Sequence, residues 1–272
     1  MTDVKQYTTK IIMFFLLALG LGGCATPMSN GTTDTTSATT AGSVEDLKAA
    51  PGTLLIMTER EEGSEPYTTR IFVNPGYLHL SDSRSPADYI LFNRKEQTIY
   101  NVTQSDRTIM VIKKKPIDIE SPIELNYEEV SQPSSAIPKI NGRQATHYRF
   151  MANGQHCYDA VVLPEDFMPD VLVAMRDFRL VLAGEHATTI DRIPKELLDP
   201  CDLSLNVFHA VKHMDHGLPI REWDRHGYQR FMKDYREGIT AGEGTLDLPE
   251  DFRRYAIGDK LAAESAKSGD KQ

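Results

Sequence analysis

Short apolar segments separated by turn signals fill the chain from Thr53 to Met151, and this repetition constrains the fold most. Apolar and polar side chains alternate in Thr98–Val102 and in Tyr77–Leu80, as in half-buried strands. Asn-Gly pairs at Asn141 and Asn153 favour tight hairpins. Strands at a spacing of about ten residues predict an antiparallel meander, which closes partly or wholly into a barrel. The predicted strands are Leu54–Glu59, Thr69–Val73, Tyr77–Ser81, Asp88–Asn93, Thr98–Val102, Thr108–Lys113, Ile123–Val130, Ala145–Met151 and Gln155–Leu163.

The spacing of apolar residues changes after Leu163, and the segments that follow are predicted to include helices. Asp166–Gly184 carries apolar residues at helical spacing, and Gly184 is a natural stop. Asp202 is placed to cap a second helix, Leu203–Met214. We therefore expect a mainly β protein with a helical insertion (α+β), built on an antiparallel curved sheet or half-barrel that is capped by helices. Later extended or ordered segments are Leu218–Trp223, Tyr228–Glu237 and Leu246–Ala256.

The first residues have the pattern of an exported precursor. Met1–Lys10 is polar and carries two lysines, and Ile11–Gly20 is almost entirely apolar. A basic region followed by an apolar stretch of about ten residues is typical of a secretory signal. A membrane-spanning helix needs about 20 apolar residues, so this stretch is too short for a permanent anchor.

The next four residues, Leu21–Cys24, resemble the lipobox of bacterial lipoproteins. The resemblance implies cleavage before Cys24 and acylation of its thiol and its new amine. Two or three acyl chains, at about 0.8 kcal/mol per buried CH₂, make such an anchor stable. Ala25 follows where an aspartate would favour the inner membrane, so we expect the periplasmic face of the outer membrane.

Composition divides the rest of the chain. Thr26–Gly42 has no aromatic or large aliphatic residue except one methionine, so it is predicted to be a disordered tether. The expected organisation is a signal peptide over 1–23, a lipidated cysteine and tether over 24–50, a half-barrel domain over 51–257 and a disordered tail over 258–272. The formal net charge is −9 and no basic stripe stands out, which argues against nucleic-acid binding.

Three cysteines are present, and the lipid would use Cys24. In the periplasm the remaining pair, Cys157 and Cys201, is most simply a structural disulfide. It would close a loop of about 45 residues, for which chain entropy predicts a gain of roughly 4 kcal/mol. A metal-thiolate site and a redox pair are the alternatives, although a redox pair is more often a close C-x-x-C.

The order of these features resembles the half-barrel proteins of outer-membrane lipoprotein sorting, of the LolA and LolB type. The features are the lipobox, the Thr-rich tether, the long meander, one helical insertion and returning strands. The segment Asp88–Ile112 and the Cys157 strand look most like an uncharacterised branch of periplasmic proteins with this predicted fold, and the likeness covers Thr53–Tyr255. It implies a curved sheet capped by helices over an apolar cavity that holds acyl chains. No exposed apolar loop for lipid insertion, as in LolB-like proteins, can be placed in this sequence.

Apolar strand residues admit two interpretations. They form a filled core with the helix residues, or an incompletely closed sheet leaves a cavity for a lipid tail between them. Methionines such as Met110 would suit a pliable lining. The candidate ligand-binding residues are Ile90, Phe92, Ile99, Met110, Ile112 and Phe150.

Three histidines, His209, His213 and His216, are the densest set of candidate metal ligands. On a continuing helix their spacing would put the three imidazoles on one face, where zinc or copper is a suitable ion. Gly217 is placed to end that helix, and a solvated histidine face is the competing interpretation. The sequence has no G-x-S-x-G elbow and no Gly-rich phosphate loop, so we expect no enzymatic activity and no cofactor.

These observations rank three functions. The first is an outer-membrane lipoprotein, held to the membrane by its N-terminal lipid, whose half-barrel binds a lipid or an acylated protein. The second is a structural or interaction module of the envelope with a filled core. The third is a metal-binding protein that uses the His209–His216 region.

Overall fold

The computed structural model describes residues 43–134 and 137–257. The predicted signal peptide, Cys24, most of the predicted tether and the predicted tail at 258–272 lie outside these residues. The strands are β1 Gly52–Arg60, β2 Tyr67–Val73, β3 Tyr77–Asp82, β4 Tyr89–Asn93, β5 Thr98–Thr103, β6 Thr108–Lys113, β7 Tyr127–Pro133, β8 Thr146–Ala152, β9 Gln155–Leu163, β10 Leu218–Asp224, β11 Gln229–Ile239 and β12 Arg253–Ala256. The α-helices are α1 Val44–Ala49, α2 Pro169–Ala187 and α3 Pro200–Leu203.

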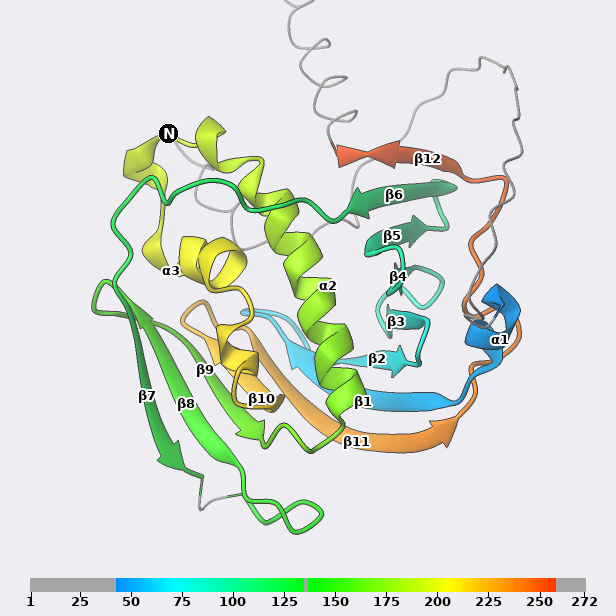
Figure 1. Cartoon of the computed structure of the whole chain (residues 1–272), viewed down its shortest axis with the longest axis horizontal. Coiled ribbons are helices and arrows are strands. Elements are labelled where there is room, and N and C mark those ends of the chain that lie inside the picture. The colour runs from blue at the N-terminus through cyan, green and yellow to red at the C-terminus, as the bar shows by residue number, and fades with distance from the viewer. Residues whose placement is uncertain (1–42, 135–136, 258–272) are drawn as a thin grey trace, which may run out of the picture.

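All twelve strands belong to one curved sheet, in the order β12-β6-β5-β4-β3-β2-β1-β11-β10-β9-β8-β7 (Figure 1). Two antiparallel meanders, β1 to β6 and β7 to β11, are joined where β1 pairs with β11. β12 adds a parallel strand beside β6. The expectation of a mainly β, curved sheet is confirmed, but the described strands do not close into a barrel and the helical capping is modest.

One continuous meander was the wrong topology, because it breaks between β6 and β7. The connection from Lys114 to Asn126 crosses to the far end of the sheet and contains Pro116 and Pro122, which have no N–H to donate to a ladder. The predicted strand from Ile123 accordingly begins only at Tyr127.

The core lies between α2 and the concave side of the sheet (Figure 1). Pro169 occupies the first turn of α2, where the missing N–H costs nothing. Val171 and Met175 of the helix pack with Leu55 and Ile71 of the sheet in the largest apolar cluster. The α2 helix therefore fills the half-barrel.

The predicted tether ends earlier than expected, because the residues just before β1 form the short helix α1. Ser43 and Asp46 cap it reciprocally through side-chain to backbone hydrogen bonds. Leu47 packs against a second apolar cluster, and Asn74 donates to its carbonyl oxygen. These contacts order the segment from Ser43 to Ala50.

The second predicted helix, Leu203–Met214, is also wrong in its bounds. Asp199, and not Asp202, caps α3 by accepting hydrogen bonds from two backbone N–H groups. α3 passes into a π-helical turn over Ser204–Phe208, and a 3₁₀ turn follows at Lys212–Met214. The histidines of this segment therefore do not share a continuous α-helix.

A disulfide joins Cys157 of β9 to Cys201 of α3, with their Cα atoms 5.1 Å apart, so the predicted pairing is confirmed. It fastens the α3 segment to the sheet. Among residues 43–134 and 137–257, no helix has the length and apolar character needed to cross a bilayer.

Candidate functional site

The six predicted ligand-binding residues lie in two separate apolar clusters. Phe92 and Ile99 are almost fully buried in the cluster beneath α2, where Phe178 of the helix meets the Phe92 ring edge-on at 5.9 Å. Ile90, Met110 and Ile112 belong to the same cluster. Phe150 instead packs near the disulfide. The structure thus brings five of the six together, in contact with a helix.

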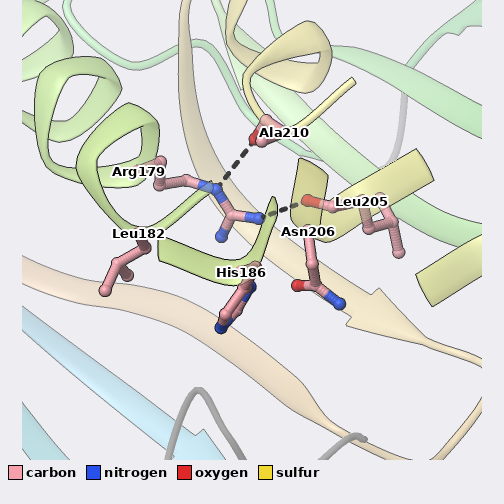
Figure 2. A pocket seen from close by; sticks show the side chains of 6 residues that line it. All are labelled: Arg179, Leu182, His186, Leu205, Asn206 and Ala210. Atoms are coloured by element: carbon pink, nitrogen blue, oxygen red, sulfur yellow. Dashed lines mark hydrogen bonds between the residues drawn. The ribbon is translucent and has the colours of Figure 1, made fainter. Parts of the chain in front are cut away.

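A small pocket lies between α2 and the π-helical turn (Figure 2), lined by Arg179, Leu182, His186, Leu205, Asn206 and Ala210. Its volume of about 10 Å³ is enough for about one water molecule. Arg179 donates hydrogen bonds to the carbonyl oxygens of Ala210 and Leu205 and so bridges the helix to the turn. This pocket is too small for an acyl chain, and none of the six predicted residues lines it.

The three predicted metal ligands rest on aromatic rings of β7, β8 and β9. The His209 ring stacks on Tyr127 at 4.5 Å, and the His216 ring stacks on Tyr148 at 4.1 Å. His213 is fully buried and meets Tyr158 edge-on at 5.4 Å.

The residues that the structure describes contain no group of three or more His, Cys, Asp or Glu side chains arranged to bind a metal ion. Each of the three imidazoles instead docks the 204–217 segment on the sheet.

A buried ion pair joins Glu222 of β10 to Arg230 of β11. The Glu222 carboxylate is fully buried and accepts a 2.6 Å hydrogen bond from Arg230 Nε and another from the Tyr158 hydroxyl. Burial by itself would raise the pKa of Glu222, but the Arg230 guanidinium and the hydrogen bond from Tyr158 outweigh it, and the pKa lies below its usual value. The carboxylate is therefore held ionised inside the protein.

Further polar groups extend this buried cluster. Glu59 of β1 is buried and accepts hydrogen bonds from the hydroxyls of Tyr67 and Tyr228, at 3.3 and 3.1 Å. His213 Nε2 lies 3.7 Å from Glu222 Oε1, and neither of its ring nitrogens has a hydrogen-bond partner among the described residues. Burial, reinforced by Arg179, lowers the pKa of His213 to about 3, so this imidazole is neutral. These side chains link five adjacent strands of the sheet, β9, β10, β11, β1 and β2.

A second set of charged and aromatic side chains lies on the opposite face of β8, β9 and β10. Asp159 is fully buried and contacts the imidazoles of His147 (Nε2 to Oδ1, 2.7 Å) and His156, and Arg149 Nε lies 3.2 Å away. His147 in turn stacks on Trp223, with ring centroids 5.2 Å apart.

Sequence reasoning missed both polar sets. The strands themselves were predicted, and strict alternation along β10 would have put Glu222 and Trp223 on opposite faces. What the sequence lacked was the pairing of β10 with β9 and β11, which brings Tyr158, Asp159 and Arg230 alongside.

No family model matches the chain, and no curated protein matches it. Among solved structures, an uncharacterised conserved protein from Thermus thermophilus matches with 12% identity and a TM-score of 0.37, over 78% of this chain and 94% of that one. A structure of PNGF-II matches with 9% identity and a TM-score of 0.41, over 78% of this chain and 32% of that one. MucB matches with 12% identity and a TM-score of 0.34, over 76% of this chain and 61% of that one. The chain thus spans most of the Thermus protein but less than two thirds of the other two.

Proposed function

We propose that this chain is a non-enzymatic lipoprotein of the bacterial envelope, anchored through acylated Cys24 at the periplasmic face of the outer membrane, and that it acts by binding through its outer surface. The anchor rests on the lipobox-like residues Leu21–Cys24. The disulfide between Cys157 and Cys201 suits an oxidising compartment.

The observation that carries binding through the surface is the filling of the half-barrel by α2. Phe92, Ile99 and Met110 have at most 3% of their surface exposed, and α2 side chains occupy the space above them. Protein interiors packed in this way leave few voids larger than a water molecule. The interaction module with a filled core therefore takes precedence over the ligand carrier among the functions that the sequence suggests.

A hydrophobic-ligand function is the second candidate, favoured by the residues at which α2 meets the sheet. Met57, Met110 and Met214 are buried there together with Met168 and Met175 of the α2 segment. Methionine side chains are flexible and polarizable, so such a contact can repack around a different shape. In this alternative an acyl chain would take the place of α2 over Ile90, Phe92, Ile99, Met110 and Ile112.

Site-specific photo-crosslinking in intact cells separates the two candidates. p-Benzoylphenylalanine would be placed at Phe231, which is 45% exposed on the outer face, or at Phe178, which α2 places against Phe92 of the sheet. We expect intermolecular adducts from position 231 and none from position 178. A lipid adduct at 178, identified by mass, with none at 231 would reverse the ranking. Thermal unfolding of both labelled proteins checks that they remain folded.

A further inference from the structure

On the face of the sheet opposite α2, arginine and aromatic side chains lie together across four adjacent strands, β2, β1, β11 and β10. Met57 and Glu59 of β1 are buried on the inner side, so Thr58 between them points outward. The strand registers pair Thr58 with Phe231, and Phe231 with Arg221. Directly paired residues share a face of the sheet. We define the outer-face cluster by this alternation as Arg60, Arg70, Arg221, Arg236, Trp223 and Phe231.

The outer-face cluster is cationic on a chain whose net charge is −9. Arg60, Arg70 and Arg221 are exposed, and none has a carboxylate within 4.0 Å among the described residues. Arg236 lies 3.8 Å from Asp234, a weak exposed pair. Three of the four arginines in the outer-face cluster are therefore without a carboxylate partner among the described residues.

Aromatic rings lie among these arginines. The Arg221 guanidinium carbon lies 5.2 Å from the centre of the Trp223 ring, and Trp223 is half-buried. Phe231, which pairs with Arg221 across the strands, exposes 45% of its surface. Tryptophan and arginine together favour a membrane–water interface, where the ring is partly buried and the cation meets a phosphate.

The segment that would lead to the membrane lies on the same side of the sheet. Leu47 of α1 packs in a cluster with Leu54 and Phe72, which pair with each other on the outer face. The proposed anchor, Cys24, is 19 residues before Ser43. Nineteen residues span at most about 65 Å, so an anchored Cys24 keeps Ser43 within that distance of the bilayer. Because the anchor tethers the domain to the bilayer, lipid headgroups are present at a high effective concentration near the outer face.

We infer that the outer-face cluster is a membrane-contact surface that binds anionic phospholipid headgroups and holds the domain against the bilayer. The inference rests on the proposed lipid anchor and adds the surface and the chemistry that it recognises. The arginines supply charge toward phosphate groups, and Phe231 and Trp223 supply apolar contact at the interface.

Trp223 is the only tryptophan in the sequence, so its fluorescence reports on this surface directly. The mature acylated chain would be reconstituted on vesicles of phosphatidylcholine, or of phosphatidylcholine mixed with phosphatidylglycerol. We expect the chain to float with both vesicles. We expect a blue shift of emission and quenching by brominated lipid only with phosphatidylglycerol. High salt should reverse both changes, because it screens exposed charges.

A charge-reversed variant and a matched control test the arginines. Arg60→Glu/Arg70→Glu should lose the shift while still floating with vesicles. Arg192→Glu/Lys195→Glu changes the net charge equally at exposed positions outside the sheet and should keep the shift. Circular dichroism checks the fold of each variant.

Failure of the membrane-contact surface and failure of the anchor give different results. Flotation with both vesicles but identical Trp223 emission overturns the membrane-contact surface and leaves the anchor standing. Loss of flotation on phosphatidylcholine contradicts the anchor, whereas a phosphatidylglycerol-dependent shift in the same samples would still support the surface. A shift with polyglutamate but not with phosphatidylglycerol vesicles would assign the face to an acidic protein and overturn the inference.

Discussion

At the scale of single residues, the protein contains buried charged side chains as well as an apolar core. Glu222 and Arg230 form a buried ion pair, and the Tyr158 hydroxyl donates a further hydrogen bond to the carboxylate. Such a pair is costly to desolvate, so it stabilises only while both partners are present. The stability of the sheet centre therefore depends on a few polar residues.

Removing one partner of this pair should be strongly destabilising. Glu222→Gln leaves the Arg230 charge buried without its counter-ion, and we expect the free energy of unfolding to fall by about 3–5 kcal/mol. Asp234→Asn, which removes a 3.8 Å pair with Arg236 at the surface, should cost less than about 1 kcal/mol. Urea denaturation of both variants measures the difference, and equal small losses would contradict the buried-pair account.

His213 should make stability depend on pH. Burial lowers its pKa to about 3, while an unfolded histidine has a pKa of about 6.5. Between these values the unfolded chain binds more protons, so the free energy of unfolding falls as the pH falls. The slope from this group is at most about 1.4 kcal/mol per pH unit.

His213→Leu removes this titration, and its stability relative to the natural protein should increase from about pH 7 to about pH 5. Exposed His226→Leu controls for the loss of one imidazole. Urea denaturation at both pH values supplies the comparison. A constant difference between His213→Leu and the natural protein would show that His213 is not buried neutral.

At the scale of elements, sequence pattern located most strands and the long helix. Thr108–Lys113 and Gln155–Leu163 have the bounds that alternation and turn residues predict. The pairing of β1 with β11 could not be predicted, because alternation in either strand is compatible with many partners. The irregular course of 204–214 could not be predicted either, because aromatic contacts such as Tyr127 with His209 outweigh the helical spacing there.

Gly184 tests how tightly α2 packs against the sheet. Alanine is normally better than glycine inside a helix by about 1 kcal/mol. Here a Cβ atom would lie 2.3 Å from the carbonyl oxygen of Lys115, so Gly184→Ala should instead destabilise by about 1–3 kcal/mol. Val173→Ala, at an exposed position of the same helix, should be neutral or slightly stabilising. Thermal unfolding decides the sign, and a stabilised Gly184→Ala would contradict the close approach.

The disulfide should stabilise the α3 segment and the whole domain. Cys157 and Cys201 are 44 residues apart, and cross-linking a loop of this length is worth up to about 4 kcal/mol. Cys157→Ala/Cys201→Ala should lower the free energy of unfolding by about 2–4 kcal/mol, and a reducing agent should lower it similarly in the natural protein. The double variant itself should not respond to the reducing agent. A natural protein equally stable under reducing conditions would contradict a structural role.

At the scale of the whole molecule, the two faces of the sheet have different chemistry. The inner face is filled by α2. The outer face has arginines around Trp223 and Phe231, and three of them have no carboxylate within 4.0 Å in the part of the chain that the structure describes. Sequence pattern indicated the apolar residues of the inner face, including Phe92 and Ile99. It could not show whether they enclose a void, because that depends on where α2 packs. The outer face became recognisable only once the strand registers were known.

Both proposals place this molecule at a membrane through Cys24, and metabolic labelling tests that claim most directly. Cells expressing the chain would be fed an alkyne fatty acid, and the mature protein would be isolated and weighed. We predict a labelled protein whose polypeptide begins at Cys24, and no label in Cys24→Ala. An unlabelled natural protein, or one that retains residues 1–23, would contradict it.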